Sequence, residues 1–153
     1  MGYFILFLLN LFAPFAALGV VVFFFFSPRR NLLKNLKYEL SQRFVLSPFG
    51  QRPAKSLWIH AASVGEVRSV IKLAGLLKEY YGCRIVLTTS TAAGRNTALK
   101  EPVFDKALLM PVDCYPLVKR FIKFYRPAYL YIVEADLWPN MIAASAVTFG
   151  LII

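Results

Sequence analysis

The chain has 153 residues, 58% of them hydrophobic, and a formal net charge of +10 at pH 7. The length leaves room for one ordinary domain of roughly 100–200 residues, but the apolar content is too high for a typical soluble domain. The single His60 and two cysteines without metal-ligand spacing, Cys83 and Cys114, predict no metal site, and we expect both thiols to be reduced. The sequence contains neither a P-loop nor a G-x-G-x-x-G motif, so no cofactor is expected.

The apolar excess lies at the start of the chain, in residues 3–26, which contain no charge and one strongly polar side chain, Asn10. As a helix these residues span roughly 36 Å, enough to cross a hydrocarbon core of about 30 Å. A secretory signal peptide would have Lys or Arg near its start, a shorter apolar core and an A-x-A cleavage site, and the sequence has none of these. A buried hairpin of a soluble core is the remaining alternative. We therefore predict a transmembrane anchor over residues 1–27.

Residues 28–55 form a basic juxtamembrane segment, in which seven cations stand against one acidic residue, Glu39. The cations are Arg29, Arg30, Lys34, Lys37, Arg43, Arg52 and Lys55. A basic flank on one side of an apolar span places that side in the cytoplasm and favours anionic lipid headgroups. No nucleic-acid-binding motif accompanies the charge, so we expect a membrane partner and no nucleic acid. Residues 31–44 have the spacing of an amphipathic helix, which either lies on the membrane surface or packs against the following domain.

From residue 56 onward, β-rich runs alternate with segments of helical spacing. Strands are predicted at 56–61, 84–90, 106–111 and 128–135, and helices at 66–80, 92–101, 115–125 and 138–150. This alternation, with continuously apolar strands, indicates an α/β fold in which a Rossmann-like parallel sheet has helices on both faces. Residues 151–153 look like a fifth strand that is cut off as it begins. We therefore expect residues 56–153 to form a Rossmann-like domain that is truncated at its C-terminus.

Polar, turn-prone residues follow three predicted strands: "ASVGE" after the first, "TTSTAAGR" after the second and "EADLWPN" after the fourth. In a parallel sheet these loops meet at one rim, where such sheets bind ligands. In the second loop, Thr89, Ser90 and Thr91 offer hydroxyl groups at a helix start, a place that suits an anion. Arg95 lies one turn further on, where it can meet a phosphate. Simple helix capping is the alternative for the hydroxyl groups.

In the first loop, Glu66 stands at the mouth of a helix. Ser63 and Glu66 fit a capping box, in which the serine hydroxyl binds the N–H three residues on and the glutamate reaches back to the Ser63 N–H. That pattern does not explain Gly65, because glycine in the first turn weakens a helix by about 1 kcal/mol. Glycine does let another molecule approach the backbone closely, and a carboxylate at this rim is placed to accept a proton from a bound hydroxyl group. Capping and catalysis both remain open for Glu66.

Glu134 ends the otherwise buried run "YLYIV", where a carboxylate is costly unless it is paired or exposed at the rim. Asp136, two residues later, is predicted to cap the helix that begins near Pro139. Glu134 has no comparable structural role, so it is a candidate functional residue.

The motifs "LWIHAASVGEV", "TTSTAAGR", "MPVD" and "IVEADLWPN", in this order and spacing, resemble the N-terminal domain of the 3-deoxy-D-manno-octulosonic acid (Kdo) transferases of lipopolysaccharide synthesis. The resemblance covers essentially residues 1–150 and implies the N-terminal half of a GT-B glycosyltransferase fold. It implies transfer of Kdo from CMP-Kdo to a lipid A precursor at the cytoplasmic face of the inner membrane, with inversion at the sugar and without a metal.

For the site residues, the resemblance implies that Glu66 is the general base on the acceptor hydroxyl and that Glu134 is a second essential carboxylate. The acceptor-binding candidates are the rim residues Ser63, Gly65, Thr89, Ser90, Thr91 and Arg95. Basic residues that face the membrane would hold the acceptor's phosphates.

The sequence departs from that family in one respect, because the domain that binds the CMP-sugar is absent. We therefore expect an acceptor-side half that does not transfer sugar by itself. Two alternatives stay open: a non-enzymatic, membrane-tethered α/β module that binds an acidic lipid or a protein, and another GT-B glycosyltransferase that acts on a lipid-linked acceptor.

Overall fold

The computed structural model describes residues 33–46, 56–134, 138–148 and 150–152, together with Leu11, Phe12, Phe15 and Gly19. Nearly all of the predicted transmembrane anchor therefore lies outside the described residues. Within the described part of the chain, no helix has the length and apolar character needed to cross a membrane.

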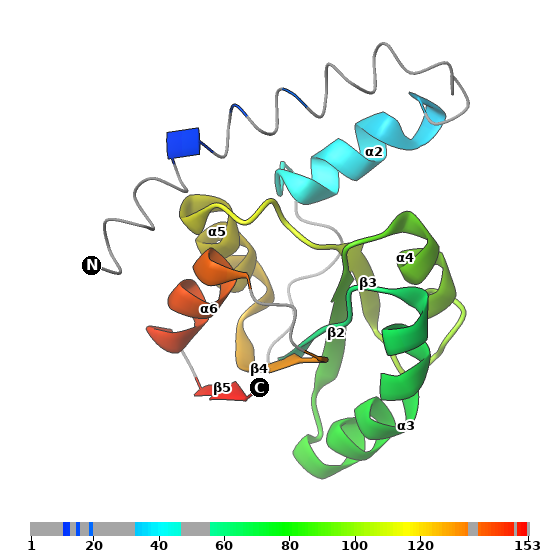
Figure 1. Cartoon of the computed structure of the whole chain (residues 1–153). Coiled ribbons are helices and arrows are strands. Elements are labelled where there is room, and N and C mark those ends of the chain that lie inside the picture. The colour runs from blue at the N-terminus through cyan, green and yellow to red at the C-terminus, as the bar shows by residue number, and fades with distance from the viewer. Residues whose placement is uncertain are drawn as a thin grey trace.

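The domain is built on a single sheet of five parallel strands (Figure 1). In chain order these are β1 (Ser56–His60), β2 (Arg84–Thr89), β3 (Lys106–Leu109), β4 (Pro127–Ile132) and β5 (Gly150–Ile152). Their order across the sheet is β3-β2-β1-β4-β5, which is the order of a Rossmann-type sheet. The predicted parallel α/β fold is confirmed, and so is the fifth strand.

Helices connect the strands and flank the sheet. They are α2 (Leu33–Arg43), α3 (Val64–Tyr81), α4 (Ala92–Ala98), α5 (Tyr115–Tyr125) and α6 (Pro139–Ala146). Helix α3 ends at Gly82, whose φ of 57° is the left-handed conformation that glycine adopts without steric cost. Strand β4 is shorter than the predicted 128–135, because Glu134 also has a left-handed backbone, with φ of 64°, and cannot continue a strand.

Alternate strand residues point to opposite faces of the sheet, and each face has its own hydrophobic core. Helices α3 and α4 cover one face, where Leu57, Ile59 and Leu87 pack against Val67 and Val70 of α3. On the other face, Trp58 and Leu130 pack against α5 and α6 (Figure 1). The predicted helices on both faces are thus present.

Helix α2 crosses the end of the sheet at which the strands finish (Figure 1). Near its C-terminus, the Gln42 side-chain oxygen accepts a 2.8 Å hydrogen bond from the backbone N–H of Leu109, and the Arg43 carbonyl accepts one of 2.9 Å from Val112. Val45, just after the helix, is 5% exposed and belongs to the core shared with α5 and α6. Of the two interpretations of residues 31–44, packing against the domain therefore holds for the C-terminal end of this helix.

Candidate functional site

The loops that follow β1, β2 and β4 lie side by side at the C-terminal rim of the sheet. His60, the last residue of β1, pairs with Thr88 of β2 and with Ile132 of β4. Backbone hydrogen bonds then join the loops: the Ser90 N–H donates to the Ala62 carbonyl at 3.1 Å, and the Val133 N–H donates to the His60 carbonyl at 2.9 Å. The three predicted polar loops therefore begin at neighbouring strand ends that are joined by backbone hydrogen bonds.

Glu66 lies in the first turn of α3 and folds back over the helix start. Its carboxylate oxygen Oε2 accepts a 2.7 Å hydrogen bond from the backbone N–H of Ala62, and its own N–H donates to Ser63 Oγ at 3.3 Å. The capping box therefore closes one residue earlier than predicted, on Ala62 instead of Ser63. The other carboxylate oxygen, Oε1, has no hydrogen-bond partner within the described residues, so a half-buried carboxylate remains able to accept a proton or a hydrogen bond.

Gly65 is exposed, and the interior of the protein does not require glycine at this position. A Cβ atom added there would come near only Ser63 Oγ, at 3.8 Å, which is an ordinary contact. The surface over Gly65 is therefore open, as the interpretation that another molecule approaches the backbone here requires.

The three hydroxyl groups of the second loop have different roles. Thr89 Oγ1 donates to the Ala62 carbonyl at 2.9 Å, and Thr91 Oγ1 caps α4 by accepting the Gly94 N–H at 3.1 Å. The hydroxyl group of Ser90 is buried and has no partner within the described residues. Thr91 thus caps the helix as the capping alternative predicts, whereas Thr89 ties its loop to Ala62. The Ser90 hydroxyl group is enclosed by the protein.

Arg95 points away from this rim. Its Nη2 donates to the Tyr38 hydroxyl group at 2.7 Å, and its guanidinium lies 4.8 Å from the centre of the Tyr38 ring. Tyr38 belongs to α2, so Arg95 faces the edge strand β3, on the far side of β2 from Glu66. The structure therefore does not bring Arg95 together with the carboxylate of Glu66.

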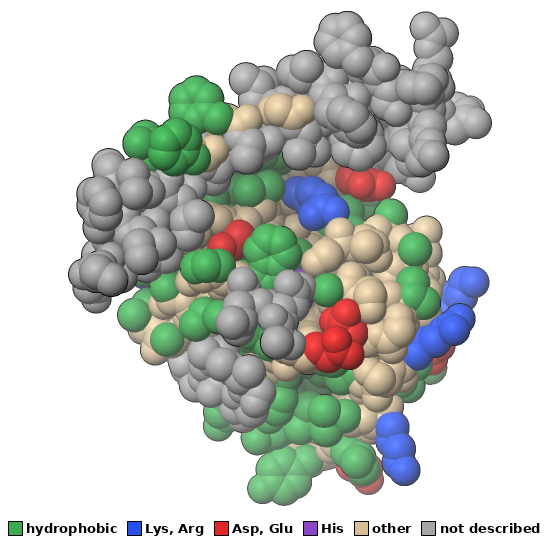
Figure 2. Space-filling view, viewed as in Figure 1, with side chains coloured by type: hydrophobic (Ala, Val, Ile, Leu, Met, Phe, Trp, Pro, Cys, Tyr) green, Lys and Arg blue, Asp and Glu red, His purple; other side chains and the backbone are tan. Residues whose placement is uncertain are grey.

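Arg43, which was predicted only as part of the basic segment, reaches the rim. Its Nη2 donates to the Ser90 carbonyl at 2.8 Å, and its Nη1 lies 3.5 Å from the Met110 carbonyl oxygen. Burial lowers the pKa of the Arg43 guanidinium, and the charge of Glu39 opposes that shift. Figure 2 shows basic and acidic side chains along the border between α2 and the rest of the domain. The sequence could have pointed to this contact, because Arg43 is the cation nearest the C-terminal end of the amphipathic segment 31–44.

Glu134 follows β4 at the same rim, and its side chain is exposed. Its φ of 64° is uncommon for a residue with a Cβ atom and costs of order 1–3 kcal/mol, which a fold keeps mainly where function needs it. The residues that follow, 135–137, lie outside the described residues.

Asp136, predicted to cap α6, lies outside the described residues, and in the described part of the chain the start of α6 is capped by the carboxylate of Asp113 in the loop after β3. Asp113 Oδ2 accepts the Asn140 N–H at 3.0 Å, and Oδ1 accepts the Met141 N–H at 2.8 Å. Trp138, at the N-cap position, makes no side-chain capping bond. Local spacing does not predict the Asp113 cap, because Asp113 lies 27 residues before Asn140 in the chain and is brought to α6 by the fold.

A buried polar cluster supports the rim from below. Trp58 Nε1 donates to Thr88 Oγ1 at 2.8 Å, and that hydroxyl oxygen lies 3.0 Å from His60 Nδ1. All three side chains are fully buried, so the cluster fixes the ends of β1 and β2 and does not reach a ligand. Across the described ranges, no three His, Cys, Asp or Glu side chains are grouped so that they could hold a metal ion.

Comparisons with known proteins bear on this rim. The model of a family described as 3-deoxy-D-manno-octulosonic-acid transferase (kdotransferase) matches residues 38–148. A 3-deoxy-D-manno-octulosonic acid transferase of Haemophilus influenzae is 36% identical over 93 residues, 59% of this chain and 22% of the relative. The protein of the same description from Aquifex aeolicus is 30% identical over 108 residues, 70% of this chain and 30% of the relative. The chain thus spans less than a third of the length of these curated relatives.

Proposed function

Because this chain belongs to the 3-deoxy-D-manno-octulosonic-acid transferase family, we propose that it forms the acceptor side of an enzyme that transfers Kdo from CMP-Kdo to a lipid A precursor. The observation that carries the proposal is the Glu66 carboxylate at the open rim, with one oxygen held and the other unused. We propose that the donor is bound by the part of such transferases that this chain does not span.

In the proposed reaction, Glu66 is the general base. The Ala62 N–H holds Oε2 and leaves Oε1 without a partner in the described part of the chain, next to the open surface at Gly65. An acceptor hydroxyl group bound there gives its proton to Oε1 while its oxygen forms a bond to the anomeric carbon of Kdo. The bond between that carbon and the CMP phosphate oxygen breaks, the electron pair leaves with CMP, and attack from the opposite side inverts the configuration. No step needs a metal.

Other rim residues would bind the acceptor. Ser63 and Gly65 line the approach to Glu66, whereas the Ser90 hydroxyl group is buried, so we assign Ser90 no direct contact with the acceptor. Glu134 would be a second carboxylate near the acceptor, held outward by its left-handed backbone. We assign Thr89 and Thr91 an indirect part, since their hydroxyl groups hold the loop beside Glu66 in place.

We also propose that residues 1–27 anchor the protein in the inner membrane and place the domain on the cytoplasmic face. This proposal rests on the uncharged run of residues 3–26, which is followed by the basic segment 28–55. The measurement is labelling of Cys83, which is partly exposed, in intact and in permeabilised cells. Labelling by an impermeant reagent only after the inner membrane is opened is expected, whereas labelling from the periplasm would contradict this orientation.

The test of the function compares two substitutions in the polypeptide encoded by the complete reading frame. Glu66→Gln keeps the side-chain length and an oxygen for the Ala62 N–H, so it should melt within a few degrees of the parent. A general base contributes typically 10²–10⁴ in rate, so turnover should fall at least a hundredfold. Ser63→Ala removes a cap bond of 3.3 Å, which should lower stability by about 0.5–2 kcal/mol. Because Ser63 takes no proton, this substitution should leave most of kcat, and a lost acceptor contact should appear as a higher KM.

Transfer is measured from CMP-Kdo to a lipid A precursor, with thermal unfolding of the same samples as the control for folding. Near-normal turnover of Glu66→Gln would show that the glutamate is only a cap. The polypeptide of these 153 residues alone should not transfer Kdo, because its sequence contains no glycine-rich phosphate loop. Transfer by that polypeptide would contradict the proposal that the donor is bound elsewhere.

A further inference from the structure

Arg43 is the last residue of α2, and the fold holds the end of this helix at several points. The Arg43 carbonyl accepts the Val112 N–H at 2.9 Å, and the neighbouring Gln42 side-chain oxygen accepts the Leu109 N–H at 2.8 Å. Val45, two residues further on, is 5% exposed in the core shared with α5 and α6. The backbone from which the Arg43 side chain starts is therefore fixed relative to the ends of the strands.

The turn that ends α2 has an uncommon backbone conformation. Val45 has a left-handed backbone, with φ of 49°, which is an outlier for a residue with a branched Cβ. The Leu46 N–H donates to the Ser41 carbonyl at 2.9 Å, which is the hydrogen bond of a Schellman motif, where glycine is the usual left-handed residue. Strain of this kind persists only where the surroundings over-determine it, and the buried Val45 side chain supplies that constraint. The end of α2 is thus held in one direction.

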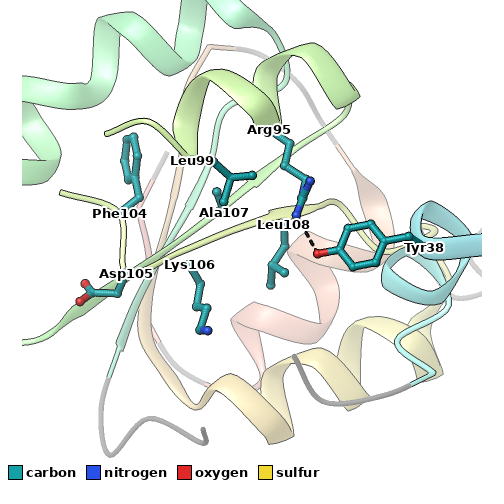
Figure 3. A pocket seen from close by; sticks show the side chains of 8 residues that line it. All are labelled: Tyr38, Arg95, Leu99, Phe104, Asp105, Lys106, Ala107 and Leu108. Atoms are coloured by element: carbon teal, nitrogen blue, oxygen red, sulfur yellow. Dashed lines mark hydrogen bonds between the residues drawn. The ribbon is translucent and has the colours of Figure 1, made fainter. Parts of the chain in front are cut away.

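A second contact holds α2 about one turn earlier. Figure 3 shows Tyr38 of α2 at the pocket between α2, α4 and the edge strand β3, with its hydroxyl group directed at Arg95. This hydroxyl oxygen accepts a 2.7 Å hydrogen bond from Arg95 Nη2. Arg95 belongs to α4, the helix that follows residues 90–91, here called the Ser90 loop. Helix α2 is therefore tied to the helix that comes directly after this loop.

From the fixed end of α2, the Arg43 guanidinium reaches the ends of two neighbouring strands. Its Nη2 donates to the Ser90 carbonyl at 2.8 Å, and its Nη1 lies 3.5 Å from the Met110 carbonyl oxygen. These two residues directly follow β2 and β3. Within the described residues, the bond from Arg43 is the one hydrogen bond that the Ser90 carbonyl accepts. A guanidinium carries its donors in a rigid fork and can bridge two carbonyl groups, whereas an ammonium group is a point charge.

The Ser90 loop is connected to the proposed base through Ala62. The Ser90 N–H donates to the Ala62 carbonyl at 3.1 Å, and Thr89 Oγ1 donates to the same carbonyl at 2.9 Å. The Ala62 N–H in turn donates to Glu66 Oε2 at 2.7 Å. Because the N–H and the carbonyl belong to one residue, a carbonyl that is held in place restricts where the N–H can lie. The position of the Ser90 loop therefore affects where the Glu66 carboxylate is held.

We propose that Arg43 is a positioning residue for the reaction proposed above, because it holds the Ser90 loop and, through Ala62, the carboxylate of Glu66. This inference rests on the proposed role of Glu66 as the general base. It assigns Arg43 no contact with the acceptor, because the guanidinium is directed at two backbone carbonyl groups. Loss of Arg43 should therefore lower kcat and leave the KM for the acceptor nearly unchanged.

The test measures transfer from CMP-Kdo to a lipid A precursor by the complete transferase. Arg43→Ala should lower kcat about tenfold or more, because small misplacements of a catalytic group are costly in rate. Ethylguanidinium should restore part of this kcat, whereas ethylammonium should not. Arg120→Ala is the matched control: this exposed arginine also donates to a backbone carbonyl, that of Leu46 at 3.4 Å, but not to the rim. Its kcat should equal that of the parent.

Arg43→Lys is the second variant, in case Arg43→Ala does not fold. It keeps the charge and an apolar stem, so its thermal unfolding should match that of the parent. We expect it to lose kcat nevertheless, because an ammonium group cannot bridge the two carbonyl groups. Parent-like kcat in Arg43→Lys would show that only the charge matters and would contradict the positioning role.

A double substitution separates positioning from a direct role. If Arg43 acts through Glu66, adding the Arg43 substitution to Glu66→Gln should cause little further loss, because the carboxylate that Arg43 positions is already absent. A further loss of about tenfold, or a loss in Arg43→Ala that appears in KM instead of kcat, would overturn this inference and leave Glu66 as the base. Near-normal turnover of Glu66→Gln would instead contradict the proposed function itself.

Discussion

Substitution of Asp113 should destabilise the domain more than any other change in the rim loops. Its carboxylate accepts the backbone N–H groups of Asn140 and Met141, and both residues are at most 1% exposed. In Asp113→Ala both buried N–H groups lose their acceptor, and an unsatisfied buried donor costs about 1–3 kcal/mol. The loss of a negative charge at a helix N-terminus adds about 0.3–1 kcal/mol. We expect a total of about 2–4 kcal/mol, and roughly half of that for Asp113→Asn, which keeps one side-chain oxygen.

The assay is urea unfolding of the chain in nonionic detergent, followed by tryptophan fluorescence and circular dichroism. The midpoint should fall while the slope stays constant, because only stability changes. Asp136→Ala is the matched control, since local spacing predicts that Asp136 is the cap. If Asp113→Ala costs less than about 0.5 kcal/mol, or if Asp136→Ala costs as much, the carboxylate of Asp113 does not hold α6 in solution.

Three further predictions concern single residues. Gly94→Ala should destabilise the fold by about 1–3 kcal/mol in urea unfolding, because the added Cβ collides with Thr89 Oγ1, and a neutral effect would show that α4 can shift. Gly65→Ala should instead raise stability by up to about 1 kcal/mol, because its Cβ meets open space. The same substitution should weaken acceptor binding in the complete transferase. A gain in stability with unchanged binding would show that Gly65 is not part of the site. Burial opposes ionisation of Asp105, but the hydrogen bond and charge of Lys78 outweigh it and lower its pKa below the usual 3.8. The parent should therefore lose its stability advantage over Asp105→Asn as the pH falls below about 4, and an advantage that is constant from pH 6 to pH 2 would contradict this.

The parts of the fold that depend on local pattern could be predicted from the sequence. Strand β2 is a continuous apolar run and α5 has a clear apolar stripe, so the period of the side chains fixes both elements and, through their alternation, the parallel sheet. The end of β4 was predicted too late, because the apolar run continues to Val133 while the chain turns at Glu134. The pattern of apolar and polar residues does not reveal a positive φ when the residue that adopts it is not glycine.

The location of the candidate site was predicted from the sequence, but the hydrogen-bond partners of its side chains were not. The rim follows from the parallel sheet, and Ser63 and Glu66 lie near the predicted cap. The acceptor of Thr89 and the donor to the second oxygen of Glu66 could not be predicted, because both groups belong to the backbone of Ala62. Nearly every residue carries the same backbone N–H and carbonyl groups, so the sequence does not show which of them a side chain will bind. The register between β1 and β2 brings the Ala62 carbonyl to Thr89, whereas the Ala62 N–H meets Glu66 four residues along the chain.

The position of α2 links the basic segment to the candidate site. Arg43 donates to the Ser90 carbonyl, and the Ser90 N–H donates to the Ala62 carbonyl, whose own N–H holds Glu66. One chain of hydrogen bonds therefore runs from the end of α2 to the proposed base. Hydrogen bonds that share groups in this way restrict one another, so the direction of the free Glu66 oxygen depends on where α2 lies. If the residues before α2 anchor the protein as we propose, the anchor also fixes the catalytic loop relative to the membrane that holds its acceptor.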